Sequence, residues 1–211
     1  MHAARIITLI VALVVVAPAS AETLEGHTLT ATSKVTMAVT ATGRYSSVDV
    51  RLHNTTRASH TVRFSWGAHF DPAVSVQPLA ITTRAERTVA AGATVTLTLQ
   101  TVCMDPSKSV AGTGFAAWRG DHDPGLAGVF AAIEFGRHLP LFSHWFSDPT
   151  KAHHTTQGIV WVYFDASKER MVSFAATHMF NGQRARATAF VDSVYPFAKN
   201  LLAFYKRSIG R

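Results

Sequence analysis

The sequence has only one cysteine, Cys103, among its 211 residues. A single cysteine excludes an intramolecular disulfide framework and any CxxC zinc or redox motif. The sequence also lacks a GxxxxGK[ST] phosphate loop, a GxGxxG turn, an HExxH zinc helix and a GxSxG nucleophile elbow. Charged residues are few, at 16%, whereas 47% of the chain is hydrophobic, and this balance excludes a disordered protein. The sequence therefore favours a folded protein with a non-enzymatic function.

Long apolar runs are missing except at the N-terminus. Residues 6–17 are apolar, follow Arg5, and precede the small residues Ala19 and Ala21 of a signal-peptidase pattern. We therefore expect residues 1–21 to be a signal peptide and the mature chain to be secreted or periplasmic. No later segment has the roughly 18 apolar residues of a spanning helix, so no transmembrane segment is expected after signal cleavage.

Basic residues outnumber acidic ones by 20 to 13, and the surplus of the mature chain is concentrated near the C-terminus. Residues 166–211 contain eight basic and two acidic residues, whereas residues 22–165 contain 11 of each. For an exported protein, a basic surface favours an anionic envelope component or a protein surface over nucleic acid. The sequence predicts an anionic-ligand surface that includes Arg184, Arg186, Lys199, Lys206 and Arg207.

Residues 24–104 have the pattern of short β-strands. Polar and apolar residues alternate at 34–39, 48–52, 61–64 and 94–99, and turn residues separate these runs. Such alternation gives each strand one buried and one exposed face. We expect residues 22–104 to form an antiparallel β-sandwich of immunoglobulin-like architecture, without the Cys…Trp…Cys signature of true immunoglobulin domains.

The remainder of the chain has a helical pattern. Residues 105–122 are rich in turn residues and are predicted as a linker or loop. A helical apolar stripe follows, at Leu126, Val129, Phe130 and Ile133. Further helices are predicted from Thr156 to about Phe164, capped by Thr155, and from Phe190 to Ile209. The expected fold class is α+β, a β-sandwich followed by a small, basic and aromatic-rich helical region at 123–211.

Cys103 lies at the end of the last predicted strand. The alternation of Val95, Leu97 and Leu99 places its side chain in the apolar interior, where a cysteine is usually inert. Its surroundings, TVCMDP at 101–106 and TQGIVW at 156–161, resemble two motifs of bacterial thioester domains. The resemblance implies a covalent adhesin in which Cys103 forms an internal thioester, with Gln157 as the candidate partner.

Two features limit the match to that family. The bond-forming glutamine of the family normally lies later, in a strand, and the only later glutamine is Gln183. The layout also resembles a broader group of uncharacterised exported bacterial proteins through residues 50–54, 92–105 and 157–161. These proteins join a β-sandwich ending in a Cys-x-(Asp/Asn) turn to a short helical region.

Histidine is abundant, with 11 in the chain, and four lie within a 17-residue stretch. Imidazole is the commonest metal ligand, so a His-rich periplasmic metal-binding protein is a further alternative. The candidates are weak, because neighbouring side chains point apart and no pair has i, i+4 spacing. They are His138, His144, His153 and His154.

No cofactor is expected. The favoured function is an exported interaction module that contacts an anionic or protein partner through its helical half.

Overall fold

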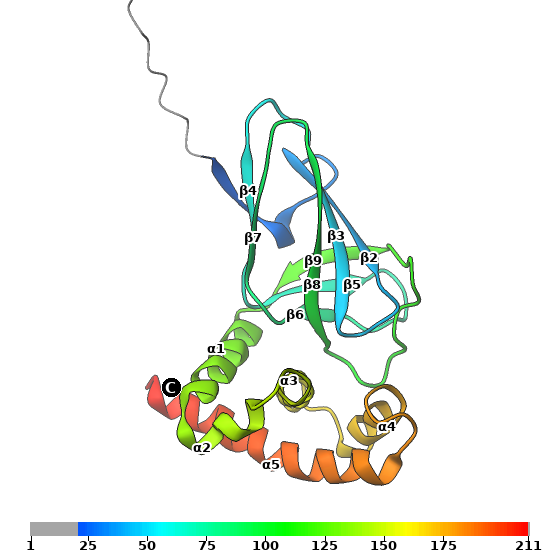
Figure 1. The fold of residues 1–211 in the computed structure, drawn as a ribbon, viewed down its shortest axis with the longest axis vertical. Coiled ribbons are helices and arrows are strands. Elements are labelled where there is room, and N and C mark those ends of the chain that lie inside the picture. Colours follow the sequence, from blue (N-terminus) through cyan, green and yellow to red (C-terminus); the bar gives the residue numbers. More distant parts are fainter. Residues whose placement is uncertain (1–20, 211) are drawn as a thin grey trace, which may run out of the picture.

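The computed structural model describes residues 21–210, and the predicted signal peptide lies outside them except for Ala21. The fold is α+β, with the strands first and most helices after them (Figure 1). We call residues 21–122 the β half and residues 123–210 the helical half. The strands are β1 Glu22–Glu25, β2 Val35–Ala41, β3 Ser47–Asn54, β4 His60–Phe64, β5 Ala68–Pro72, β6 Leu79–Ile81, β7 Ala85–Val89, β8 Thr94–Cys103 and β9 Trp118–His122. The helices are the 3-10 turn η1 Gly26–Thr28, then α1 Pro124–His138, α2 Pro140–Ser143, η2 His144–Phe146, α3 Pro149–Tyr163, α4 Lys168–His178 and α5 Arg184–Ser208.

The described strands form two sheets. The smaller has the order β1-β4-β7, in which β1 is parallel to β4 and β4 is antiparallel to β7. The larger has the order β2-β3-β8-β6-β5-β9 and is antiparallel throughout. The long strand β8 changes partner along its length, pairing first with β3 and then, from Thr101 to Cys103, with β6. The end of β8 therefore lies in the part of the sheet nearest the helices (Figure 1).

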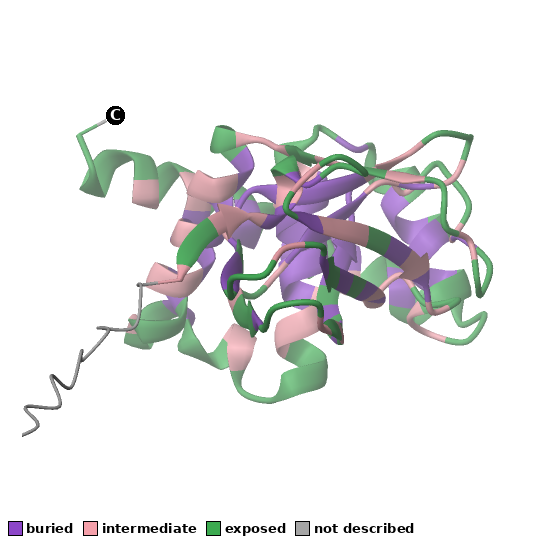
Figure 2. Ribbon diagram, turned by 90° about the horizontal axis from the view of Figure 1, so that it is seen from above, coloured by how far each residue is buried: buried purple, intermediate pink, exposed green. Residues whose placement is uncertain are grey.

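The core of the β half is built from alternate residues of both sheets. Val48, Val50 and Leu52 of β3 are fully buried, as the alternation predicts, and they belong to the same core cluster as Val62 and Phe64 of β4. In Figure 2 the buried segments occupy the interior, and the exposed segments surround them. Burial of these apolar side chains supplies the main stabilising force of this half.

Three local predictions differ from the structure, and one of them is the C-terminal helix, predicted from Phe190, which begins six residues earlier at Arg184. Residues 118–122 lie in the stretch predicted as a linker but form β9, because tertiary pairing with β5 holds a strand that has no apolar alternation of its own. Helix α3 is predicted to start at Thr156 but begins seven residues earlier. It begins at Pro149, where the Asp148 side chain accepts a hydrogen bond from the Lys151 amide at 2.8 Å. An acidic N-cap followed by proline is a strong helix start.

The helical half has its own core, centred on α3 and covered by α5 (Figure 1). The two helices approach closely at Gly158, where an added Cβ would lie 2.8 Å from a methyl carbon of Val194. One turn further along α3, Trp161 is fully buried. Cys103 and its neighbour Val102 also belong to this core, so the end of β8 is packed into the helical half. Within the described residues, no helix combines the length and apolarity needed to cross a membrane.

Candidate functional site: a cleft between the strands and the helices

A cavity of about 620 Å³ opens where the β half meets the helical half. Its volume is in the range of small-molecule sites, which often lie between domains. The β half contributes Trp66, the segment 82–84 and Gln100, and the helical half contributes α1, α3 and the segment between them. A molecule bound here would contact both halves at once.

Two buried polar atoms in the wall of the cleft have no hydrogen-bond partner among the described residues. They are the hydroxyl oxygen Oγ1 of Thr156, a residue that is 3% exposed, and the ring nitrogen Nε2 of His153. Leaving a buried polar atom without a partner costs about 1–3 kcal/mol. Both atoms lie beneath the surface of the cleft wall, so a ligand could reach them only if the wall moved.

His153 is held neutral by its surroundings. Burial, with a smaller contribution from the neighbouring His154, lowers the pKa of His153 to about 4. Its ring lies 5.6 Å from the ring of Tyr45, which belongs to the turn before β3. At neutral pH the imidazole therefore offers a hydrogen-bonding nitrogen without a positive charge.

Two arginines, Arg84 and Arg137, line the cleft. The guanidinium of Arg84 lies 3.9 Å from the ring centroid of Trp66, and no carboxylate of the described residues pairs with it. Arg137 lies over the ring of Phe146, and its Nε is 3.9 Å from Glu134.

The two carboxylates that line the cleft already have partners in the helical half. Glu134 Oε1 is 3.0 Å from His138 Nε2, and Asp148 caps α3. A carboxylate with such partners attracts a bound cation less strongly than a free one. The formal charges of the lining side chains cancel, and Arg84 is the charged group among them without a partner of opposite charge.

The structure brings Cys103 and Gln157 together, as the thioester resemblance implies, but through the cysteine backbone. Gln157 Oε1 accepts a hydrogen bond from the Cys103 amide at 2.8 Å, and Gln157 Nε2 donates to the Cys103 carbonyl at 2.5 Å. Both side chains are fully buried, which confirms the predicted inward orientation of Cys103. Gln157 thus pairs with β8 much as a neighbouring strand would, and it connects the two halves.

The thiol of Cys103 is protonated at neutral pH. Burial raises its pKa to about 12. The nearby indole N–H of Trp161 lowers the pKa of the thiol, but by less than burial raises it. This N–H makes no hydrogen bond of standard geometry to a described residue. The thiolate is the nucleophilic form of cysteine, so this site disfavours attack by Cys103. The later glutamine, Gln183, is exposed at the start of α5, where Oε1 accepts from Arg186 at 3.2 Å.

The four predicted histidine candidates have separate environments. His138 pairs with Glu134 on α1, and His144 lies against Trp145. His153 faces the cleft, whereas the ring of His154 contacts Phe180 and Phe190. None of the four belongs to a group of metal-ligating side chains within residues 21–210.

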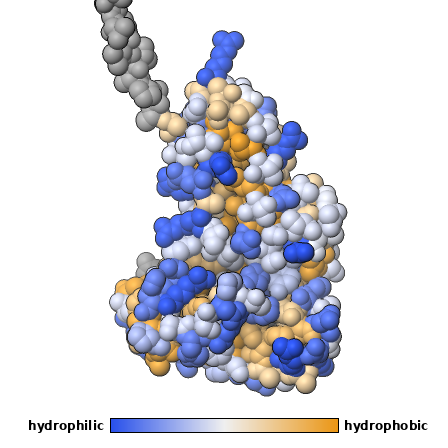
Figure 3. Space-filling view, in the orientation of Figure 1, coloured by the Kyte–Doolittle hydropathy of each residue, from blue (hydrophilic) through white to orange (hydrophobic). Residues whose placement is uncertain are grey.

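The five predicted basic residues are all exposed but are spread along α5. Arg184 and Arg207 are separated by about 35 Å along the helix axis. Arg186 lies over Phe180, and Lys199 lies over Tyr195, each as a cation–π pair. Hydrophobic residues separate the hydrophilic groups on the lower part of the molecule in Figure 3.

The residues that give the cleft its chemistry, apart from His153, are absent from the predicted set. Arg84 lies in a polar turn between β6 and β7, and Arg137 lies near the end of α1. Neither has a local sequence feature that distinguishes it from a solvated surface residue. Thr156 and Gln157 are adjacent in the TQ motif, yet only the fold shows that one faces the cleft and the other β8. Comparison of the chain with family models, curated proteins and solved structures found no match in any of the three.

Proposed function

We propose that the protein is a non-enzymatic binding module that takes a small anionic ligand, with a carboxylate or phosphate group, in the cleft between its two halves. The observation that carries this proposal is the guanidinium of Arg84, which has no ion-pair partner among the described residues and borders, with Arg137, a cavity of about 620 Å³. The expected export of the chain makes an extracytoplasmic ligand part of the proposal. In this proposal the β half is an immunoglobulin-like sandwich that supports one wall of the site.

The groups in the cleft suit recognition of an anion. Guanidinium groups bind carboxylates and phosphates with charge-assisted, often bidentate hydrogen bonds. A histidine with a pKa near 4 is a poor proton carrier at neutral pH, which favours binding over acid–base catalysis.

The test is a thermal-shift and calorimetric screen of the mature chain with citrate, succinate and inorganic phosphate, each matched by sodium chloride of equal ionic strength. We expect at least one of these anions to bind saturably and raise the Tm. Arg84→Gln should weaken that binding by about 10-fold or more, since hydrogen bonds to charged groups contribute about 1.5–3 kcal/mol.

The matched control is Arg186→Gln, which removes an exposed arginine of α5 that lies outside the cleft. This variant should bind the anion as the wild type does. The proposal is wrong if no anion of the panel binds beyond the sodium chloride control. It is equally wrong if Arg186→Gln loses as much affinity as Arg84→Gln.

Covalent adhesion through a thioester of Cys103 is the second candidate, favoured by the contact between Cys103 and Gln157. A thioester would give a denatured mass one ammonia below that of the free thiol and amide, and methylamine would restore and extend that mass. The full calculated mass, unchanged by methylamine, would exclude this candidate and leave the cleft proposal in place.

A further inference from the structure

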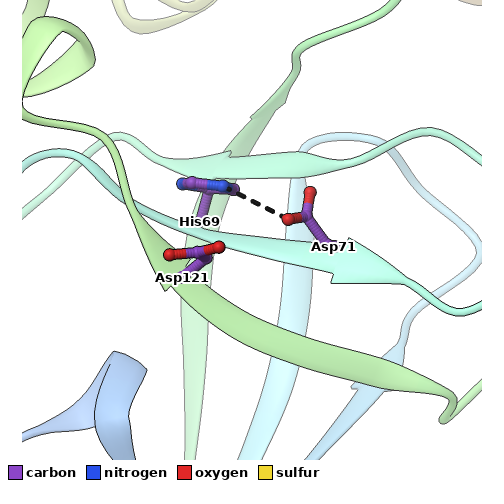
Figure 4. Close-up of side chains that lie close together, drawn as sticks. All are labelled: His69, Asp71 and Asp121. Carbon is purple, nitrogen blue, oxygen red and sulfur yellow. Dashed lines mark ion pairs between the residues drawn. The ribbon is translucent and has the colours of Figure 1, made fainter.

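A second group of polar side chains lies at the far edge of the larger sheet, where β5 pairs with the edge strand β9. His69 of β5 stands directly opposite Asp121 of β9, and Asp71 is two residues further along β5. Residues opposite one another, and residues two apart in one strand, lie on the same face of a sheet. The three side chains therefore gather on one face (Figure 4).

The spacing of these side chains suits a metal ion. One ligand atom from each of the three lies within 4.8 Å of the others. His69 Nε2 and Asp71 Oδ2 are 3.5 Å apart, which is longer than a well-formed N–H···O hydrogen bond. Two ligands bound to one tetrahedral zinc ion lie about 3.3 Å from each other. The His69–Asp71 pair thus already has the separation of two zinc ligands.

The surroundings of His69 prepare it as a ligand. Its Nδ1 lies 3.2 Å from the carbonyl oxygen of Gly67, so Nδ1–H donates there and Nε2 carries the lone pair. Metal-binding histidines commonly have such a hydrogen bond from the second ring nitrogen. The side chain is only 9% exposed, and Nε2 makes no hydrogen bond to another described residue. A buried imidazole therefore aims an unbonded nitrogen at two carboxylates.

The carboxylates leave the site open on one side. The side chains of Asp71 and Asp121 are 35% and 53% exposed, so water or a ligand can reach an ion held between them. The His122 backbone N–H donates a hydrogen bond to Asp121 Oδ1 at 2.8 Å, which fixes the position of that carboxylate. Arg119 lies 3.9 Å from Asp121 and is 79% exposed, so its side chain can move away when a cation binds.

We propose that His69, Asp71 and Asp121 bind a divalent transition-metal ion of the zinc type, with water in the remaining position. One imidazole and two carboxylates match the ligand preferences of zinc, and their two negative charges balance those of the ion. Three protein ligands with an open fourth position are the arrangement of zinc sites that bind an exogenous ligand. The site shares no residue with the cleft, so it is independent of the proposed function.

The experiment is isothermal titration of ZnCl₂ into the mature protein after dialysis against EDTA. We expect one saturable site per chain and a rise in Tm that chelator reverses. Asp121→Asn replaces a half-exposed carboxylate, so it should fold normally by circular dichroism while weakening Zn²⁺ binding by about 100-fold or more. His69→Gln should have the same effect on binding.

The matched control for the other histidines is His138→Gln, an exposed residue whose ring contacts a single carboxylate. This variant should retain the full affinity for Zn²⁺. The proposal is overturned if the wild type shows no saturable Zn²⁺ binding. It is also overturned if folded Asp121→Asn binds as tightly as the wild type, since the ion would then be held by other histidines.

Discussion

Replacing Gln157 with leucine would remove the two hydrogen bonds that connect α3 with the end of β8. Leucine has a similar size, so the main loss is the pairing of the Cys103 amide and carbonyl, which are buried at that point. Each unsatisfied group costs about 1–3 kcal/mol, so we expect the free energy of unfolding to fall by about 2–6 kcal/mol. This is a large part of the roughly 5–15 kcal/mol of a typical domain.

The assay is urea unfolding followed by tryptophan fluorescence, because Trp161 is buried one turn from Gln157. Gln183→Ala, a change at an exposed glutamine, is the control and should alter stability by less than about 0.5 kcal/mol. If Gln157→Leu unfolds within about 1 kcal/mol of the wild type, the structural role assigned to Gln157 is refuted.

Gln157→Glu gives an independent check through pH. An ionised carboxylate at position 157 would place a negative oxygen against the Cys103 carbonyl, so the folded state should favour the protonated acid and raise its pKa. A group whose pKa is raised on folding contributes stability at low pH and loses it as the pH rises. The variant should therefore be more stable near pH 4 than near pH 7, relative to the wild type.

Three further predictions concern buried groups. Cys103 should resist iodoacetamide in the folded protein and react fully in urea, as measured by intact mass, because burial keeps its thiol protonated; labelling of the native chain would contradict this. Gly158→Ala should lower the free energy of unfolding by about 1–3 kcal/mol through overlap with Val194, and an unchanged urea midpoint would contradict the close packing of α3 and α5. Because folding lowers the pKa of His153, the free energy of unfolding of the wild type should decrease by as much as about 3 kcal/mol as the pH falls from 6.5 to about 4. His153→Gln should remove most of that loss in urea titrations at each pH.

The strands that alternation predicts are those with one apolar and one polar face, namely β2, β3, β4 and β8. The others lack this pattern for physical reasons. All three residues of β6 are buried, so no polar face exists to reveal a period of two. The sequence of β9, WRGDH, is largely polar, and β9 forms because β5 offers it backbone partners.

The candidate sites differ in how far the sequence could reveal them. The i, i+2 spacing of His69 and Asp71 is visible in the sequence, but the Asp-Pro pair at 71–72 is also typical of a turn and hides the strand. Asp121 joins these residues only through strand pairing across about 50 positions. The cleft is even harder to predict from the sequence, because Arg84 and Thr156 belong to different halves and meet only when the halves pack together.

The two proposed sites therefore depend to different degrees on the contact between the halves. The three metal ligands come from neighbouring strands of one sheet, whereas the cleft needs both halves in their correct relative position. Gln157→Leu weakens the connection between the halves without touching either set of residues that contacts a ligand. We therefore expect this variant, in its folded state, to bind the anion more weakly while its affinity for Zn²⁺ stays within about two-fold of the wild type. An equal loss of affinity at both sites would contradict this prediction. It would show that the structure of the β half itself depends on Gln157 and that the two sites are not independent.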